Sequence, residues 1–214
     1  MLWLWLILYG AIFAVPRALV PEAQMLLTPA LLTVFWAALI VHLRKIGAAE
    51  RCGLCMGAKL TPSDAILMLP LFIIAALNVA FGGTFPSLAT SVYMLYAVFG
   101  EEFFFRGVLQ NEFSKKLGTV RAAVAATALF ALMHMLNALG TSSCDAFVQV
   151  LCAFGAGLLL AAVRIKTGSI FLPLLAHAAI NLTGTVEVLP HAAAYIVVSA
   201  LCAVCAMRLL GKTK

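Results

Sequence analysis

Charged residues are scarce in this sequence of 214 residues. Only 10% of the residues are Asp, Glu, Lys or Arg, whereas 64% are hydrophobic and the mean hydropathy is +1.10. Ordinary soluble domains contain about 25% charged and about 45–50% apolar residues, so the composition excludes a soluble globular domain. No polar stretch is long enough to form such a domain beside the apolar runs. We therefore expect one integral membrane domain over residues 1–214.

The sequence also lacks the marks of a cleaved leader and of a nucleic-acid-binding protein. The first segment, Met1 to Val15, has no basic residues before its apolar run and no clear small-residue cleavage site after it, so we interpret it as a retained helix. The net charge of +6 arises from Lys and Arg residues in short loops, which is the pattern that orients membrane proteins. We expect no nucleic-acid partner.

Eight apolar stretches are long enough to cross a bilayer, for which a helix needs about 17–25 residues. The sequence thus predicts an all-α fold, a polytopic transmembrane bundle of about eight helices. The stretches cover residues 2–20, 26–43, 64–82, 87–112, 122–139, 146–163, 169–186 and 191–209.

Basic residues occur in every second loop between these stretches, and positive charge collects on the cytoplasmic side of membrane proteins. We therefore expect both termini in the cytoplasm, with Arg17 as the single basic residue of the outward loops. Short loops and a compact length favour a prokaryotic inner membrane. The basic residues are Arg44, Lys45, Arg51, Lys59, Lys115, Lys116, Arg121, Arg164 and Lys166, with Arg208, Lys212 and Lys214 near the C-terminus.

Three charged residues interrupt the fourth apolar stretch: Glu101, Glu102 and Arg106. A charge at the bilayer centre costs about 2.5–3.5 kcal/mol even on lenient insertion scales, so such residues usually serve a function. Glu102 and Arg106 are four residues apart, on one helix face, and are expected to form a supporting ion pair. Glu101 points about 100° away from Glu102 and is expected to face a cavity.

Polar side chains in two other apolar stretches lie at a similar depth. His134 belongs to the fifth stretch, and His177 and Asn181 are one helical turn apart in the seventh. At 1.5 Å of rise per residue, they and Glu101 lie roughly 13–20 Å from the cytoplasmic ends of their helices. We therefore expect these four side chains to meet around one polar cavity.

These residues together suit amide hydrolysis without a covalent intermediate. Glu101 is expected to act as general base on a water molecule that it shares with His134. His177 and Asn181 are expected to donate hydrogen bonds to the oxyanion that develops on the attacked carbonyl. The reaction expected from the residues alone is hydrolysis of an amide bond.

The same residues resemble a known family, the CPBP (Abi) intramembrane proteases, which include the CAAX prenyl endopeptidases. Glu101 to Arg106 matches EExxxR, Phe130 to His134 matches FxxxH, and His177 to Asn181 matches HxxxN. The matched motifs fall in residues 88–186, the expected catalytic core. The resemblance implies a glutamate-dependent, metal-independent endopeptidase of eight helices, with a cavity opening to the membrane and the cytoplasm. The expected substrate is a membrane-anchored peptide or protein. It implies that Glu101 and His134 activate water, and that His177 and Asn181 form the oxyanion site.

Three alternatives remain open from the sequence alone. Buried Glu and His residues also serve proton pathways in small transporters. A chain of the same fold can also bind peptides without cutting them, as an immunity or scaffolding factor. Glu101, His134 and His177 would also make a three-ligand zinc site with an open fourth position, although no cofactor is expected and no HExxH motif is present. The pair Cys52 and Cys55 forms a CxxC, which we interpret as two free thiols.

Overall fold

The computed structural model describes residues 2–55, 61–184 and 189–211, and nearly all of them are helical. The expected all-α membrane bundle is confirmed. Lys59, Lys212, Lys214 and part of the expected loop at 183–190 lie outside the described residues.

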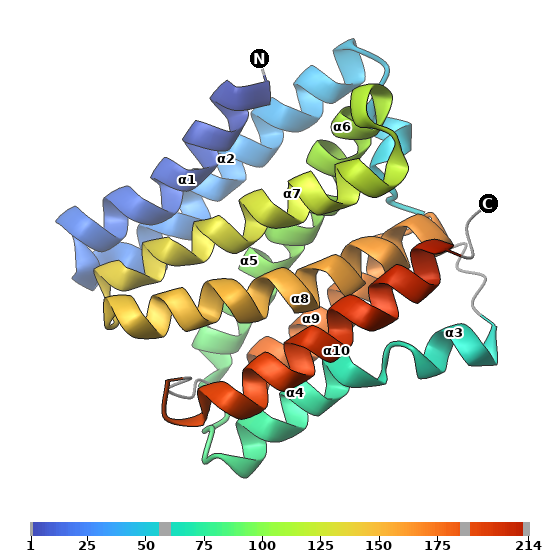
Figure 1. The fold of residues 1–214 in the computed structure, drawn as a ribbon. Helices are drawn as coiled ribbons and strands as arrows, with labels where there is room; N and C mark the ends of the chain where they lie inside the picture. Colours follow the sequence, from blue (N-terminus) through green and yellow to red (C-terminus); the bar gives the residue numbers. More distant parts are fainter. Residues whose placement is uncertain (1, 56–60, 185–188, 212–214) are drawn as a thin grey trace.

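The α-helices follow the predicted apolar stretches closely, and Figure 1 shows how they are arranged. They are α1 (Leu2–Leu19), α2 (Gln24–Lys45), α3 (Pro62–Ile66), α4 (Leu69–Ala80), α5 (Leu88–Glu101), α6 (Gln110–Leu117), α7 (Thr119–Met133), α8 (Ser143–Thr167), α9 (Phe171–Leu182) and α10 (Ala192–Gly211). Four short 3₁₀ turns join or extend them: η1 (Pro21–Ala23), η2 (Ala49–Cys52), η4 (His134–Leu139) and η5 (Leu189–His191). The remaining element, η3 (Glu102–Leu109), is a π-helix.

Six helical stretches among the described residues are long and apolar enough to cross a membrane. They are Leu2–Leu19, Pro21–Lys45, Pro62–Ala80, Thr119–Leu139, Ser143–Thr167 and Leu189–Gly211. The other two predicted spans are helical as well, but they are built differently. The fourth is made of three consecutive pieces, α5, η3 and α6, and the seventh is the shorter apolar helix α9. Both of these spans carry motif residues.

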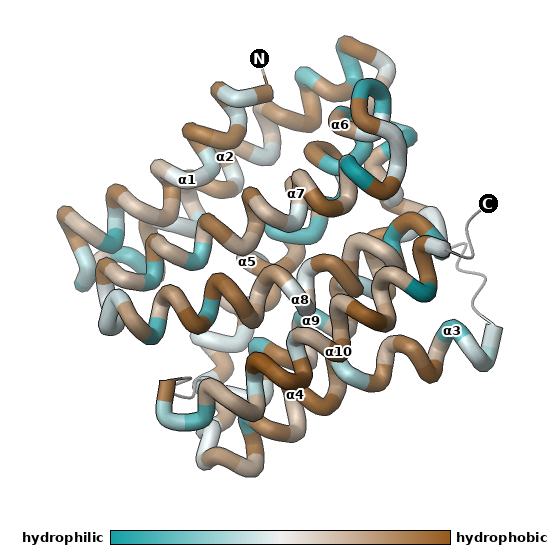
Figure 2. The backbone as a smooth tube through the Cα atoms, in the orientation of Figure 1, coloured by the Kyte–Doolittle hydropathy of each residue, from teal (hydrophilic) through white to brown (hydrophobic). Residues whose placement is uncertain are grey.

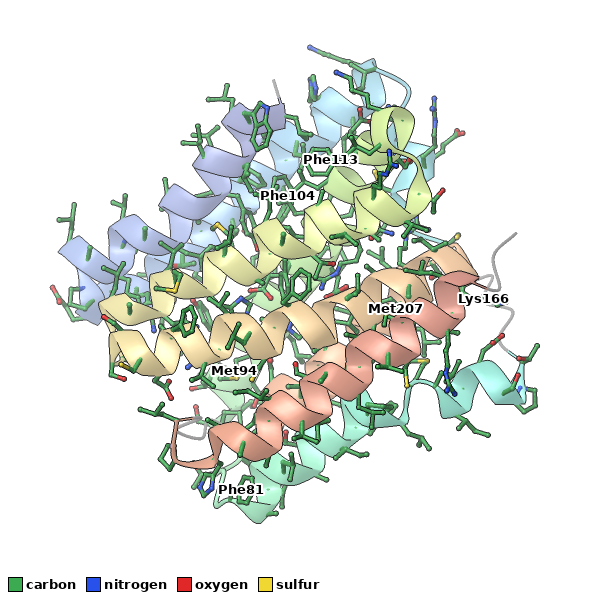
Figure 3. The ribbon with its side chains drawn as sticks, viewed as in Figure 1. Phe81, Met94, Phe104, Phe113, Lys166 and Met207 are labelled. Carbon is green, nitrogen blue, oxygen red and sulfur yellow. The ribbon has the colours of Figure 1, made fainter. Side chains whose placement is uncertain are left out.

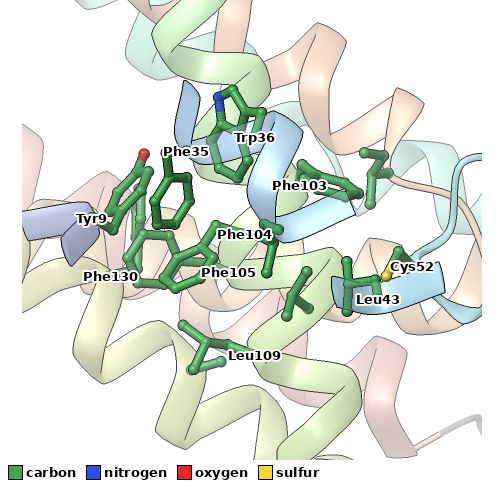
Figure 4. Packing of buried hydrophobic residues seen from close by; sticks show 14 of the residues in the cluster. Tyr9, Phe35, Trp36, Leu43, Cys52, Phe103, Phe104, Phe105, Leu109 and Phe130 are labelled. Carbon is green, nitrogen blue, oxygen red and sulfur yellow. The ribbon is translucent and has the colours of Figure 1, made fainter. Parts of the chain in front are cut away.

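Helix α8 runs through the middle of the bundle, between α7 and α10 (Figure 1). The bundle has two apolar cores. The first joins α1, α2, η3 and α7, and Figure 4 shows its aromatic centre around Phe104. The second joins α4, α8, α9 and α10. Groups that bridge η3, α8 and α9 therefore lie between the two cores.

Apolar side chains also cover the outside of the bundle, as expected for a surface in contact with lipid. Figure 2 shows hydrophobic residues along most of each helix, with hydrophilic residues gathered around the turn after α6. Figure 3 shows side chains projecting outward from the helices, among them Met207, which is 59% exposed. Exposed apolar area of this extent is typical of a membrane protein rather than a soluble one.

The basic loops meet at one end of the bundle, which we call the basic end. Arg164 Nη2 donates to the carbonyl of Arg51 at 3.0 Å, and Lys166 pairs with Asp64 at 3.6 Å. The opposite end, which we call the Arg17 end, joins the last turn of α1 to the turn between α7 and α8. There Arg17 Nη1 donates to Asn137 Oδ1 at 2.8 Å. The described basic residues are therefore distributed unequally between the two ends.

Candidate active site

The charged motif begins where α5 changes into the π-helix η3. All eight residues of η3, Glu102–Leu109, are buried. The sequence predicts an uninterrupted α-helix here, and the structure corrects this. π-helical turns are rare and occur frequently at functional sites. The wider turn places the three phenyl rings and the two charged side chains of η3 in a fully enclosed environment.

Glu102 and Arg106 form the ion pair that their spacing predicts. Arg106 Nη1 donates to Glu102 Oε1 at 3.0 Å, and the two side chains are 1% and 0% exposed. Arg106 Nη2 also donates to the carbonyl of Gly157 at 3.3 Å. The guanidinium carbon lies 4.0 Å from the centroid of the Phe130 ring, within cation–π distance. Arg106 therefore joins η3 to α7 and α8.

His177 lies between the two glutamates. Its Nδ1 donates to Glu102 Oε1 at 2.8 Å, and its Nε2 lies 3.6 Å from Glu101 Oε2. Because Glu102 Oε1 also accepts from Arg106, that oxygen is an acceptor and His177 Nδ1 carries the proton. The separation from Glu101 is too long for a direct hydrogen bond. The sequence predicts Arg106 as the main partner of Glu102. In the structure Glu102 also accepts a hydrogen bond from His177, whose other ring nitrogen faces Glu101.

His134 stands across from Glu101, at the start of η4. Its Nδ1 lies 3.1 Å from the carbonyl of Phe130 and must donate to it. Its Nε2 is then the acceptor nitrogen, suited to a water hydrogen. The Phe130 ring makes edge contacts with both histidines, with centroids 4.9 Å from His134 and 5.8 Å from His177. Phe130 therefore packs against each imidazole.

Glu101 and His134 line one cavity of about 90 Å³. A single water needs about 10–15 Å³ on the same measure, so several waters fit. The Glu101 side chain is 23% exposed, whereas Glu102 is fully buried, so the first carboxylate alone meets the cavity. The other lining residues are Tyr9, Phe13, Arg17, Gln24, Phe105, Phe130, Met133, Leu136 and Asn137.

The predicted oxyanion pair is placed differently. Neither His177 nor Asn181 is among the residues that line the cavity. His177 is 6% exposed and uses Nδ1 on Glu102. Asn181 is half-buried one turn further along α9, and its side chain makes no hydrogen bond within the part of the chain that the structure describes. The structure thus brings together Glu101, His134 and His177, and leaves Asn181 apart.

The zinc alternative would need Glu101, His134 and His177 to converge on one point. Within residues 2–55, 61–184 and 189–211, no group of three or more His, Cys, Asp or Glu side chains is arranged to hold a metal ion. The thiols of Cys52 and Cys55 are both free.

The cavity lies toward the Arg17 end of the bundle. Arg17, Gln24 and Asn137 belong to its lining, and none of the described residues of the basic loops does. The expectation of cytoplasmic termini and the expectation of a cavity that opens to the cytoplasm are therefore incompatible in this structure. Hydropathy and loop charge predict the direction in which each helix crosses the membrane. They do not predict at which end of the bundle the helices leave a cavity.

The sequence gives no role at the site to Tyr9 or Gly157. It places Phe130 in a motif but does not predict that its ring contacts both histidines. A signal exists for Gly157, because it and Gly155 stand two apart in a helix otherwise rich in Leu and Ala. Closely spaced small residues indicate that another group approaches the backbone. Nothing comparable marks Tyr9 in the first span.

We expect Gly157→Ala to displace Arg106 and to lower both stability and activity. An ideal Cβ at this position would lie 2.9 Å from Arg106 Nη2 and 3.0 Å from a ring carbon of Phe130. Overpacking of this kind costs about 1–3 kcal/mol. Thermal unfolding in detergent measures the loss. Gly211→Ala is the matched control, because its Cβ would meet no atom within 4 Å. Equal melting temperatures for Gly157→Ala and the parent would contradict this packing.

These features define a class of protein: a membrane-embedded helical bundle with a carboxylate and an imidazole, Glu101 and His134, lining a cavity large enough for water. A family model described as Type II CAAX prenyl endopeptidase Rce1-like matches residues 61–183. The chain belongs to this family of CAAX-type intramembrane proteases, which confirms the resemblance seen in the motifs. The searches of curated proteins and of solved structures returned no significant match. The match covers the segment from α3 to α9, and α1 and α2 precede it.

Proposed function

We propose that this protein is a glutamic intramembrane endopeptidase, which cleaves a peptide bond in a membrane-associated peptide or protein. The observation that carries the proposal is the shared cavity. Glu101 and His134 line one space with room for water, inside a bundle whose surroundings are apolar. The family supports the class of reaction, and the shared cavity supports these roles for Glu101 and His134.

In this proposal a water molecule lies between Glu101 and His134. Glu101 takes one proton as the water oxygen attacks the carbonyl carbon, and His134 Nε2 accepts a hydrogen bond from the other hydrogen. The carbonyl π electrons move to oxygen and form an oxyanion. Glu101 then returns its proton to the amide nitrogen as the carbon–nitrogen bond breaks. No covalent intermediate and no metal ion takes part.

Glu102, Arg106 and His177 act on this step through Glu101. Arg106 and Glu102 hold His177, whose Nε2 faces the Glu101 carboxylate at 3.6 Å. His177 is therefore a positioning residue in the proposal, rather than an oxyanion donor. Asn181, unbonded to any described side chain and half-buried, remains available to contact bound substrate.

A cleavage assay tests the proposal. The purified protein in lipid nanodiscs is given two fluorogenic peptides, one prenylated at a CAAX terminus and one anchored by an acyl chain. We expect hydrolysis of at least one peptide, unchanged by a strong chelator and lost in Glu101→Gln. Loss of activity with the chelator and recovery with zinc would replace water activation by Glu101 and His134 with metal catalysis. Peptide binding without cleavage would favour the immunity or scaffolding alternative.

The location proposed is a prokaryotic inner membrane, with both termini in the cytoplasm and the cavity toward the outer side. Two native thiols report this orientation. Cys144 is exposed at the Arg17 end, and Cys55 is exposed at the basic end. Cys52 is a poor target, because burial raises the pKa of its thiol and lowers the fraction of reactive thiolate.

We expect a membrane-impermeant maleimide to label Cys144 in intact cells and Cys55 only after permeabilisation. Cys144→Ala should remove the first signal, and Cys55→Ala the second. Labelling of Cys55 alone in intact cells would reverse the orientation and place the cavity on the cytoplasmic side. The result therefore decides which side of the membrane presents the scissile bond.

A further inference from the structure

A second cavity lies at the basic end of the bundle. Its volume is about 250 Å³, and within the described part of the chain it shares no lining residue with the cavity that Glu101 and His134 border. The start of α1, the end of α2 and the passage from η3 into α6 surround it, and Figure 1 shows these segments together at one end of the molecule. The lining residues are Leu2, Trp5, Leu39, His42, Leu43, Ile46, Val108 and Glu112.

The second cavity suits a hydrocarbon chain better than a cluster of waters. Its buried side is apolar and consists of Leu39, Leu43 and Val108, each at most 3% exposed. Of its described lining residues, only Trp5, His42 and Glu112 carry polar atoms in their side chains, and Glu112 is already paired with Lys115. A buried water needs about two to four polar partners, which this lining cannot offer to the many waters that the volume would hold.

Two unpaired cations stand beside the second cavity. Arg44 and Lys45 directly follow the lining residue Leu43 in the last turn of α2, and both side chains are exposed. Neither forms a hydrogen bond or an ion pair with any residue that the structure describes. Arg164 and Lys166 at the same end each have a partner, at 3.0 Å and 3.6 Å. The positive charge next to the cavity therefore lacks a counter-charge from the described chain.

Charge is what can select the occupant of this cavity. In a bilayer, the move of an acyl chain from the lipid phase into an apolar cavity brings no hydrophobic gain, because both surroundings are equally apolar. A cation near the membrane surface attracts an anionic headgroup, and each Lys or Arg contributes about fivefold in affinity. An apolar cavity beside unpaired cations therefore fits an anionic phospholipid better than a zwitterionic one.

We propose that the second cavity is a binding site for an anionic phospholipid, with one acyl chain against Trp5 and Leu43 and the phosphate on Arg44 and Lys45. The bound lipid joins α1 to α2 and to the end of η3. Val108 belongs to η3, the π-helix that also holds the buried ion pair, so the acyl chain packs against the segment that supports the candidate active site. The lipid site needs no peptidase activity and stands independently of the proposed function.

Fluorescence of Trp5 tests the proposal. The variant Trp3→Phe removes the 61% exposed indole of α1 and leaves Trp5 and the buried Trp36. This protein is reconstituted in phosphatidylcholine vesicles with a minor share of phosphatidylglycerol, and bromine atoms on the acyl chains of either lipid quench the indoles that they contact. We expect brominated phosphatidylglycerol to quench Trp5 with a binding constant about 30-fold above that of brominated phosphatidylcholine, because two cations contribute. Replacing Trp5 by Phe should remove this difference.

The double variant Arg44→Gln/Lys45→Gln should bind the two lipids almost equally. Arg208→Gln is the matched control, because Arg208 is also an exposed cation, but it lies in the last turn of α10, beside the second core and away from the cavity. This control should keep the parent's preference for phosphatidylglycerol. Equal quenching by both lipids in the parent would overturn the proposal, and so would a preference that survives in the double variant.

Other occupants give different results, each of which contradicts the proposal. Farnesol that displaces brominated phosphatidylglycerol more effectively than unbrominated phosphatidylglycerol does would assign the cavity to an isoprenoid chain. Quenching that disappears at high protein-to-lipid ratio, together with cross-linked dimers, would assign it to a second copy of the chain. A melting temperature raised by phosphatidylglycerol without quenching of Trp5 would place the lipid on the cations alone, outside the cavity. Glu101→Gln should keep the lipid preference of the parent whether or not it cleaves peptides.

Discussion

Glu101→Gln is expected to lower kcat by about 10²–10⁴-fold, the usual contribution of a general base. The amide has nearly the same shape as the carboxylate but cannot take a proton from water. Because the Glu101 side chain borders the cavity and makes no direct hydrogen bond to a described side chain, the fold should be preserved. Kinetics with an anchored peptide and a melting curve measure the two properties separately.

Controls for this variant come from the same chain. Glu50→Gln changes an exposed carboxylate of η2 and should leave kcat at the parent value. His134→Gln should show a loss comparable to Glu101→Gln, whereas His42→Gln, at a half-buried position of α2 outside the lining of the Glu101 cavity, should not. A folded Glu101→Gln or His134→Gln protein with nearly full activity would refute the water-activation mechanism.

Arg106→Leu is expected to lower the free energy of unfolding by about 3–5 kcal/mol, the usual cost of breaking a buried pair. The reason is the burial of Glu102, whose side chain is 0% exposed and would lose the guanidinium that compensates its carboxylate. His177 alone would remain to compensate it. Glu102→Gln should cause a similar loss, because the guanidinium then lies buried beside a neutral amide. Activity should fall in both variants, since His177 loses its fixed position.

The double variant Glu102→Leu/Arg106→Leu makes this prediction sharper. Replacing both members of a buried ion pair by apolar groups is often neutral for stability. We therefore expect most of the melting temperature to return while activity stays low. The exposed pair of Glu112 and Lys115 provides a reference, because breaking such a pair costs at most about 1 kcal/mol. A melting temperature of Arg106→Leu close to the parent's would contradict the role of the pair.

Much of the fold follows from composition and periodicity. Apolar runs of sufficient length leave helices as the only arrangement that satisfies backbone hydrogen bonds in lipid. The shared depth of Glu101 and His134 also predicts their common cavity, since depth depends only on rise per residue. The spacing of Glu102 and Arg106 predicts their contact for the same kind of local reason.

Other features depend on contacts that no local pattern encodes. The change to π geometry at Glu102 rotates the following side chains, so the α-helical period no longer describes the faces. His177 turns toward Glu102 rather than the cavity, because a buried carboxylate in another helix accepts its proton. Tyr9 reaches the site from a span without any motif. Packing between helices that are distant in the sequence determines the π-helical turn, the direction of His177 and the place of Tyr9. The sequence alone shows only that the spans exist.

The helix that carries Tyr9 and Arg17 is also the least enclosed. Only 11% of the most apolar window of α1 is buried, against 61% for α8. Segments with few buried contacts loosen at a smaller free-energy cost than the rest of a protein. Contacts with lipid acyl chains thus contribute much of the packing that holds α1 against the rest of the bundle. The thickness and fluidity of the surrounding bilayer consequently bear on the architecture of the reaction chamber.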